Sequence, residues 1–285
     1  MLNKRINFSI IAISLLLILS PLLARANEEQ KALQLGCVAY AKEASAKAYR
    51  QVGQYLEDKL GCQVVVTVYP SYQEVIVDIA NEKLDLAILS PLVHVCASEA
   101  CELTVLGHGV YGVSGDFAYR STIFVRADSS INSLEDLEDK SIAFVDQLSA
   151  SGFIVPKVAL MKESIIEIEE VFAGNHVDAF RSLLNEDVDA CATLNTIMED
   201  EPTLGQHAAD IKVLWTSEFV IPSDAFVATA KVSPQLQEKI TTLLLQYGQA
   251  QREGSSKSNP IFSDFVPEDE KLYDALRGLV NEFSN

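Results

Sequence analysis

The chain has 285 residues, 48% of them hydrophobic and 22% charged, and its formal net charge is −18 at pH 7. This composition suits one large α/β domain or two modest ones, each able to build its own core. The acidic excess argues against nucleic acid and anionic lipid surfaces as partners, since both repel a negatively charged protein.

The first 26 residues predict a signal peptide. Lys4 and Arg5 precede the apolar run Ile10–Leu19, and Ala24–Ala26 supplies an A-x-A cleavage site. We expect the mature chain to begin at Asn27, with 19 basic against 40 acidic residues and so a net charge of −21. No later segment is apolar for long enough to span a bilayer, so we expect a soluble periplasmic protein without a membrane anchor.

Short apolar strands alternate with amphipathic helices after residue 27, a pattern that predicts parallel sheets covered by helices. The first series comprises a strand over 33–39, a helix ending at Leu60, a strand over 64–68, a helix over 71–83, a strand over 84–89, a short helix after Pro91 and a strand over 103–106. Together these segments predict one doubly wound unit.

A glycine-rich passage at 107–115 separates that unit from a second series of the same kind. Its expected elements are strands over 121–125, 142–145, 168–172, 188–192 and 211–215, with helices starting near 133, 152 and 174. Two further helices, one from Ser233-Pro234 and one after Pro267, should pack back on the first unit.

The chain would therefore cross twice between two lobes and form a hinged cleft. We expect an α/β protein with two doubly wound sheets, in which residues 27–119 and 228–285 form lobe 1 and residues 120–227 form lobe 2. Because ligands gather at the carboxyl ends of strands in open α/β sheets, the loops that precede helices are the places to look for a site.

The segment from Phe144 to Pro156 is the most informative such loop. A buried strand runs into Ser149, Ser151 and Gly152 just before a helix begins. The first N–H groups of a helix have no intrahelical partner and carry partial positive charge, so this turn suits an oxyanion. Taken alone, the pattern is more typical of a serine that caps the helix.

Two more loops, Gly174–His176 and Ile221–Asp224, also sit at strand ends that face the expected cleft. With these in place, the sequence resembles the periplasmic binding proteins of phosphonate, phosphite and phosphate ABC transporters over nearly the whole mature chain. The residues that carry the resemblance are Tyr55-Leu-Glu-Asp-Lys-Leu-Gly61, Ser71-Tyr72, Leu84-Asp-Leu-Ala-Ile-Leu89, Tyr119-Arg-Ser121, Ser149-Ala-Ser-Gly152 with Pro156, Gly174-Asn-His176, Val188-Asp189, Leu214-Trp-Thr-Ser217 and Ile221-Pro-Ser-Asp224.

The resemblance implies a two-lobed type II binding-protein fold that closes on a phosphorus oxyanion and presents it to a membrane permease. By motif position it also implies the ligand-binding residues, which are Tyr72, Tyr119, Ser149, Ala150, Ser151, His176 and Asp224. Hydroxyls and amides donate to anionic oxygens, whereas an ionised carboxylate only accepts. Asp224 would therefore demand a ligand that keeps a proton or carries an ammonium group.

Two positions depart from the family pattern. Ala150 stands where the family usually has threonine, which removes a hydroxyl but keeps the backbone donor. Thr196 stands where aminoalkylphosphonate binders have a glutamate, which makes aminoethylphosphonate a less favoured ligand.

Two other functions remain open from the sequence. Ser151, His176 and Asp224 supply the residue types of a hydrolase triad, but the chain has no Gly-x-Ser-x-Gly elbow, so we expect binding and no catalysis. The second alternative is a ligand sensor for a membrane kinase, which could recognise an oxyanion such as arsenite through Cys37 or Cys191.

The cysteines, the two histidines near them and Ser90 are the remaining residues that could carry a function. Five cysteines are an odd number for an oxidising compartment, and Cys96 and Cys101 are close enough in sequence to bridge. His94, Cys96, Cys101 and His108 match no standard zinc spacing, so we expect no metal and no cofactor. Ser90 either caps a helix or lines the cleft.

Overall fold

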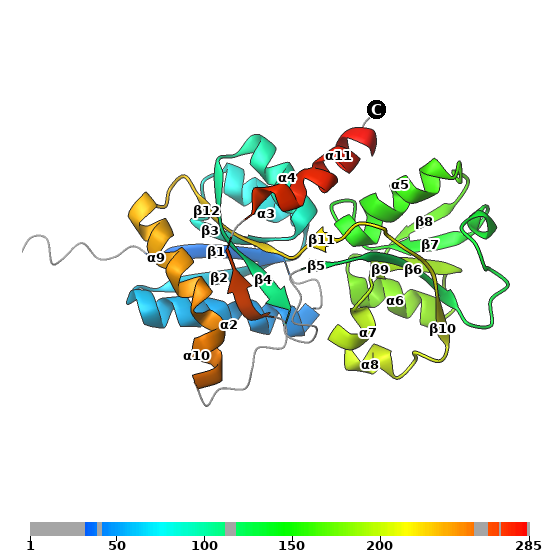
Figure 1. Cartoon of the computed structure of the whole chain (residues 1–285), viewed down its shortest axis with the longest axis horizontal. Coiled ribbons are helices and arrows are strands. Elements are labelled where there is room, and N and C mark those ends of the chain that lie inside the picture. The colour runs from blue at the N-terminus through cyan, green and yellow to red at the C-terminus, as the bar shows by residue number, and fades with distance from the viewer. Residues whose placement is uncertain (1–31, 39–41, 112–117, 254–261, 268, 284–285) are drawn as a thin grey trace, which may run out of the picture. The chain divides into compact units, whose positions relative to one another are not determined.

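The computed structural model describes residues 32–38, 42–111, 118–253, 262–267 and 269–283. The expected signal peptide lies outside these residues. Within them are two large β-sheets, each with helices on both faces, and a two-stranded sheet of β11 (Ile221–Pro222) and β5 (Ala118–Tyr119) (Figure 1). In this part of the chain, no helix has both the length and the apolar composition needed to cross a membrane.

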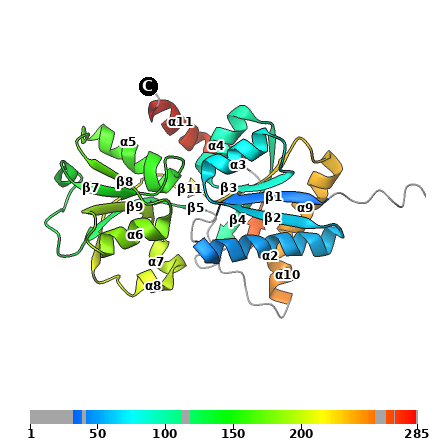
Figure 2. The same cartoon turned by 180° about the vertical axis from the view of Figure 1, so that it is seen from behind.

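The first sheet has six strands in the order β13-β4-β12-β3-β1-β2. Their bounds are β1 (Leu33–Val38), β2 (Val64–Tyr69), β3 (Leu86–Leu89), β4 (Leu103–Tyr111), β12 (Ala225–Thr229) and β13 (Phe262–Val266). One face carries α2 (Lys42–Leu60), α9 (Pro234–Leu245) and α10 (Tyr247–Glu253). The other carries α3 (Tyr72–Ala80) and α4 (Pro91–Ala100), as both views show (Figures 1 and 2).

The residue pattern of this lobe explains why its elements form. Ala48, Val52, Leu56 and Leu60 repeat every four residues along α2 and are buried, which gives the helix one apolar face. All four residues of β3 are buried, as expected for a strand covered on both faces.

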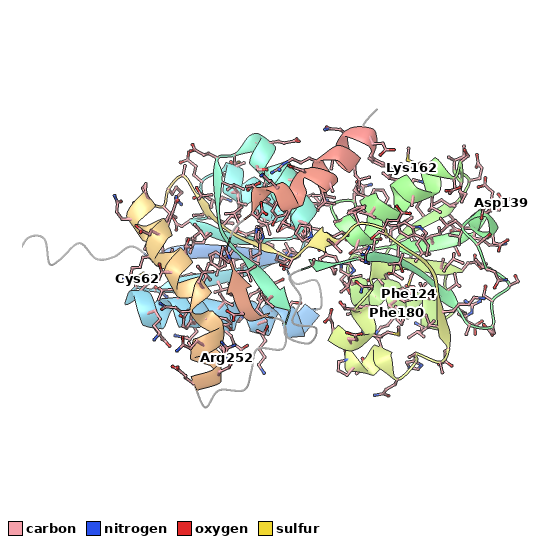
Figure 3. The ribbon with its side chains drawn as sticks, viewed as in Figure 1. Cys62, Phe124, Asp139, Lys162, Phe180 and Arg252 are labelled. Atoms are coloured by element: carbon pink, nitrogen blue, oxygen red, sulfur yellow. The ribbon has the colours of Figure 1, made fainter. Side chains whose placement is uncertain are left out.

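The second sheet has five strands in the order β10-β6-β9-β7-β8. Their bounds are β6 (Ser121–Arg126), β7 (Ser141–Phe144), β8 (Glu169–Phe172), β9 (Ala190–Leu194) and β10 (Ile211–Thr216). The helices of this lobe are α5 (Val155–Lys162), α6 (His176–Leu184), α7 (Ile197–Asp200) and α8 (Pro202–Gly205). Phe124 on β6 meets Phe180 on α6 edge-on, with ring centroids 5.4 Å apart, and so fixes that helix to the sheet (Figure 3).

Two short strands join the lobes. β5 (Ala118–Tyr119) pairs antiparallel with β11 (Ile221–Pro222), and Arg120 Nη1 donates to the carbonyls of Ser217, at 2.6 Å, and Glu218. Since β12 pairs with β3 and β4 from Ala225 onward, we propose that the second crossing ends before Ala225. The boundary expected from the sequence, after Val227, would split this strand.

Both sheets are mixed, whereas the alternating pattern predicted parallel ones. β12, β4 and β13 run antiparallel to their neighbours in the first sheet, as β6 does against β9 and β10 in the second. The sequence reading missed β12 and β13 because strands that return from another lobe leave no local strand–helix repeat.

The last helix, α11 (Asp274–Phe283), contacts α4 of the first lobe and α5 of the second. Phe283 lies edge-on to Phe153, with ring centroids 5.9 Å apart, and Lys162 Nζ lies 3.1 Å from Glu282 Oε2. Lys162, on α5, is labelled in Figure 3. The expectation that both C-terminal helices pack on the first lobe is met only in part by α11, which contacts α4 there but also contacts α5 of the second lobe. It holds for α9, which packs on β4, β13 and α2.

Candidate ligand-binding site

A small hollow lies where the carboxyl ends of strands from both sheets meet. Its lining residues are Val38, Tyr49, Tyr72, Ser90, Tyr119, Ser149, Ala150, His176, Leu194 and Asp224. Its volume is about 20 Å³, measured for the centre of a water-sized sphere, whereas one ordered water needs roughly 10–15 Å³ on that measure. On this measure the hollow is little larger than the space that one ordered water needs.

The structure brings six of the seven expected ligand-binding residues to this hollow. The six are Tyr72, Tyr119, Ser149, Ala150, His176 and Asp224. Ser151 is buried beside them but is not one of the lining residues. Sequence reasoning missed Tyr49, which shares an apolar helix face with core residues and gives no polar signal.

The turn after β7 combines both functions considered for its serines. Ser149 Oγ accepts a hydrogen bond from the Gly152 N–H at 3.0 Å and so caps the turn, yet the residue also lines the hollow. The expected helix begins here as one turn of π-helix, Ala150–Ile154, followed by α5. Gly152 is needed because a Cβ there would lie 2.6 Å from Val145 Cβ.

His176 is the first residue of α6. Gly174, at a φ of +83°, turns the chain into the helix, and Asn175 caps it by accepting from the Asp178 N–H at 2.9 Å. His176 Nδ1 lies 2.7 Å from Thr193 Oγ1. Burial lowers the pKa of His176 to about 3, so the ring is neutral near pH 7.

Among the described residues that line the hollow, Asp224 is the only acidic one. Its Oδ2 accepts a hydrogen bond from the Tyr49 hydroxyl at 3.2 Å, and its carbonyl accepts from the Gly109 N–H at 3.1 Å. Burial raises the pKa of Asp224 to about 6, although the Tyr49 hydrogen bond acts in the opposite direction. The carboxyl is therefore mostly ionised near pH 7.

The two cleft tyrosines stay protonated. Burial, and secondly the charge of Asp224, raise the pKa of both Tyr72 and Tyr119. Each phenol therefore keeps a hydrogen that it can donate.

Two serine hydroxyls near the phenols have no good partner. Ser90 Oγ faces Tyr72 and Ser151 Oγ faces Tyr119, but neither makes a hydrogen bond of ordinary geometry within the described residues. Ser90 is the N-cap residue of α4, its side chain does not cap the helix, and the residue lines the hollow. Buried hydroxyls without partners are uncommon in folded proteins, and of these two only Ser90 belongs to a residue that lines the hollow.

The field in the hollow comes from dipoles and one carboxylate. None of the described residues that line it is lysine or arginine. Instead, α3 begins at Tyr72, α4 follows Ser90, and α6 begins at His176, so helix N-termini from both lobes converge there. Such termini hold anions through N–H groups and the positive end of the helix dipole.

The geometry does not support a hydrolase. Within the described residues, Ser151 Oγ has no hydrogen-bonded base, His176 Nδ1 is bound to Thr193 and Asp224 is bound to Tyr49. A nucleophile needs a base within hydrogen-bond reach and a third group that orients this base.

The cysteines and the remaining histidines have separate surroundings. Cys37 and Cys191 are fully buried in apolar clusters, and burial raises the pKa of both thiols, to about 12 for Cys37. All five cysteines are unpaired in the described part of the chain. His94 contacts Glu270 and His108 contacts Tyr273, and no group of described residues could hold a metal ion.

Two mixed α/β sheets, joined by a double crossing and sharing a small hollow at their strand ends, define the class of type II periplasmic binding proteins. Residues 36–275 match the family described as ABC transporter, phosphonate, periplasmic substrate-binding protein. The chain belongs to this family, which binds substrates and does not catalyse their conversion. The family and the fold class expected from the sequence are thereby confirmed.

Individual relatives agree with this assignment. The chain is 30% identical to the phosphonates-binding periplasmic protein of Escherichia coli over 84% of its own length and 72% of that protein. It is 27% identical to the phosphate-import protein PhnD of Mycolicibacterium smegmatis, over 70% of this chain and 66% of that protein. The structure of PhnD1 from Prochlorococcus marinus in complex with methylphosphonate superposes with a TM-score of 0.77, at 16% identity, over 89% of this chain and 98% of that one.

Proposed function

We propose that the hollow captures one small phosphorus oxyanion that retains a proton, and that the closed protein delivers it to the permease of an ABC transporter. The observation that carries this proposal is the pairing of neutral donors with the carboxylate of Asp224 among the described residues that line one hollow.

The donors come mainly from the second lobe. The Ser149 N–H is donated to the Asp146 carbonyl and the Gly152 N–H to Ser149 Oγ, so we assign the N–H groups of Ala150 and Ser151 as the backbone donors of this turn. The imidazole of His176 and the phenols of Tyr72 and Tyr119, which line the hollow, are the side-chain donors. Hydrogen bonds to a charged group contribute roughly 1.5–3 kcal/mol each, so four or five give micromolar or tighter affinity after association costs.

Asp224 supplies the selectivity. An ionised carboxylate accepts a hydrogen bond from a P–OH group and repels an anion without one. Phosphite, phosphate and methylphosphonate all have a state with one P–OH group, whereas sulfate near neutral pH has none. The relative solved with methylphosphonate supports a ligand of this size and chemistry.

The proposal also includes export. Residues 1–26 would direct the chain to the periplasm and be removed there, so that the mature protein begins at Asn27. Mass spectrometry of the N-terminus of protein recovered from the periplasm tests this step, and retention of residues 1–26 would contradict it.

Calorimetric titration with phosphite, methylphosphonate, phosphate, sulfate and arsenite in parallel tests the ligand assignment. We expect saturable heat with at least one phosphorus oxyanion and none with sulfate or arsenite. A ligand at a hundred times its dissociation constant should also stabilise the folded protein by about 2.7 kcal/mol in a thermal-shift experiment. Equal binding of sulfate, or no response to any phosphorus oxyanion, would contradict the proposal.

A further inference from the structure

Thr193 contacts His176 from the side of the ring that carries Nδ1. Thr193 lies on β9 and is fully buried, and its Oγ1 is 2.7 Å from His176 Nδ1. Alternate residues of a strand face the same side of a sheet, and Cys191, two residues earlier, packs in the cluster that includes Val177 and Phe180 of α6. Thr193 therefore points toward the start of the helix that carries His176.

The donor in this hydrogen bond follows from counting hydrogens. A neutral imidazole has one N–H donor and one acceptor nitrogen, and a threonine hydroxyl always has one hydrogen to donate. Among the described residues, His176 Nδ1 is the only hydrogen-bond partner of Thr193 Oγ1. If Nδ1 carried the ring hydrogen, the buried hydroxyl hydrogen of Thr193 would have no acceptor, which is costly in a dry interior.

The neighbouring threonine hydroxyls do not accept a hydrogen bond from Thr193. Thr193 pairs in register with Thr122 on β6, and Thr122 pairs with Thr216 on β10, so the three lie in one row across the sheet. The Thr122 hydroxyl is hydrogen-bonded to Thr216 at 3.2 Å and not to Thr193. Among the described residues, the hydroxyl of Thr193 is therefore hydrogen-bonded to His176 and not to another threonine of the row.

We propose that Thr193 is a positioning residue that donates to His176 Nδ1 and thereby holds the ring hydrogen on Nε2, where it serves as a donor to the bound oxyanion. The inference rests on the proposed function. The burial that keeps the ring neutral supports it, because a doubly protonated ring could not accept from Thr193. In the opposite tautomer, Nε2 would present a lone pair and repel an anion.

The test combines a spectroscopic readout with an affinity. Long-range ¹H–¹⁵N spectra of the histidine rings report which nitrogen carries hydrogen, and the His176 signals are assigned by their loss in His176→Gln. These spectra are recorded on the ligand-free protein, and the affinity for methylphosphonate is measured by calorimetry. The variants are Thr193→Val, which removes the hydroxyl at nearly constant shape, Thr193→Ser, which keeps it, and Thr122→Val, a matched control in the same row.

We expect the wild-type ring to carry its hydrogen on Nε2. Thr193→Val should lose this preference and bind methylphosphonate about tenfold more weakly or worse, the loss expected for one charge-assisted hydrogen bond. Thr193→Ser and Thr122→Val should match the wild type in both measurements. Melting temperatures of all variants show whether each is folded.

Several results would overturn the inference. These are a wild-type ring hydrogen on Nδ1, an unchanged tautomer and affinity in Thr193→Val, or a changed tautomer with unchanged affinity. The wild-type spectrum decides the first point even if Thr193→Val fails to fold. If the wild type gave no heat with any phosphorus oxyanion, the proposed function would be wrong, while the spectrum would still decide the role of Thr193 in holding the ring.

Discussion

The two walls of the hollow have opposite chemistry. The donor wall, formed by Ser149, Ala150 and His176 of the second lobe, presents neutral N–H and O–H groups at helix starts. The acceptor wall is formed by the carboxylate of Asp224, which accepts a hydrogen bond from the Tyr49 hydroxyl and is mostly ionised near pH 7. Donors of this kind attract any small oxyanion, so we propose that affinity comes mainly from the donor wall and selectivity from the acceptor wall.

The largest expected effect is on the pH dependence of the free energy of unfolding, because burial disfavours the charged form of Asp224. Its folded-state pKa of about 6 lies above the ordinary value, so between about pH 4 and pH 6 the folded protein binds more protons than the unfolded chain. The free energy of unfolding contributed by Asp224 therefore falls as pH rises through this window, by roughly 3 kcal/mol in total.

Asp224→Asn should remove this dependence, because the amide keeps an acceptor for Tyr49 but does not ionise. His176, with its lowered pKa, changes stability in the opposite direction, but that contribution is common to both proteins and cancels in their difference. Urea denaturation across this pH range measures the difference, which should grow in favour of the variant as pH rises. If the difference in unfolding free energy between the variant and the wild type stayed constant with pH, Asp224 would not have a raised pKa in the folded protein.

On the donor wall, His176→Ala should weaken methylphosphonate binding by roughly 10- to 100-fold, since one hydrogen bond to a charged group is lost. His207→Ala is the matched control, because the His207 side chain is 50% exposed and pairs with Asp210 on the surface. Calorimetry near neutral pH gives both affinities. Equal affinities for the two variants would remove His176 from the donor wall.

The selectivity of Asp224→Asn sharpens the comparison further. The amide adds an N–H donor where the wild type has only acceptors, so sulfate should bind the variant better than it binds the wild type. We expect the ratio of methylphosphonate to sulfate affinity to fall by about tenfold or more. Asp210→Asn, with a side chain that is 67% exposed, serves as the control and should leave the ratio unchanged. If Asp224→Asn kept the wild-type ratio of methylphosphonate to sulfate affinity, Asp224 would not be the residue that discriminates against sulfate.

The smallest expected effect comes from removing a contact between the two lobes, and it tests whether that contact contributes to ligand affinity. Phe283 at the end of α11 contacts Phe153 across the lobes, and an aromatic pair of this geometry contributes about 0.5–1.5 kcal/mol. Phe283→Ala should therefore weaken all ligands by less than about tenfold, without changing their order. Leu245→Ala, at the exposed end of α9, is the control. A change in ligand order would show that α11 affects selectivity.

Much of the donor wall could be predicted from the sequence because its signals are local. Ser149–Gly152 and Gly174–His176 each place a small or capping residue directly before a helix, and the structure has both turns where the pattern puts them. Asp224 was predicted from the Ile221–Asp224 motif, whose first two residues form the crossing strand β11.

The missed parts depend on contacts between distant segments. Tyr49 reaches Asp224 across 175 positions of sequence, and Thr193 reaches His176 from a strand whose pattern is purely apolar apart from that hydroxyl. The contact of α11 with the second lobe was not predicted, because an apolar stripe indicates only that one face of a helix is buried, and not against which partner.

Proton-linked calorimetry tests the central claim most directly. Methylphosphonate is titrated into the protein above the second pKa of the ligand, in two buffers with different heats of ionisation. If one proton sits between the ligand and Asp224, about one proton should be taken up for each ligand bound, and none should be taken up by Asp224→Asn. Binding without proton uptake in the wild type, or the same uptake in both proteins, would contradict the account.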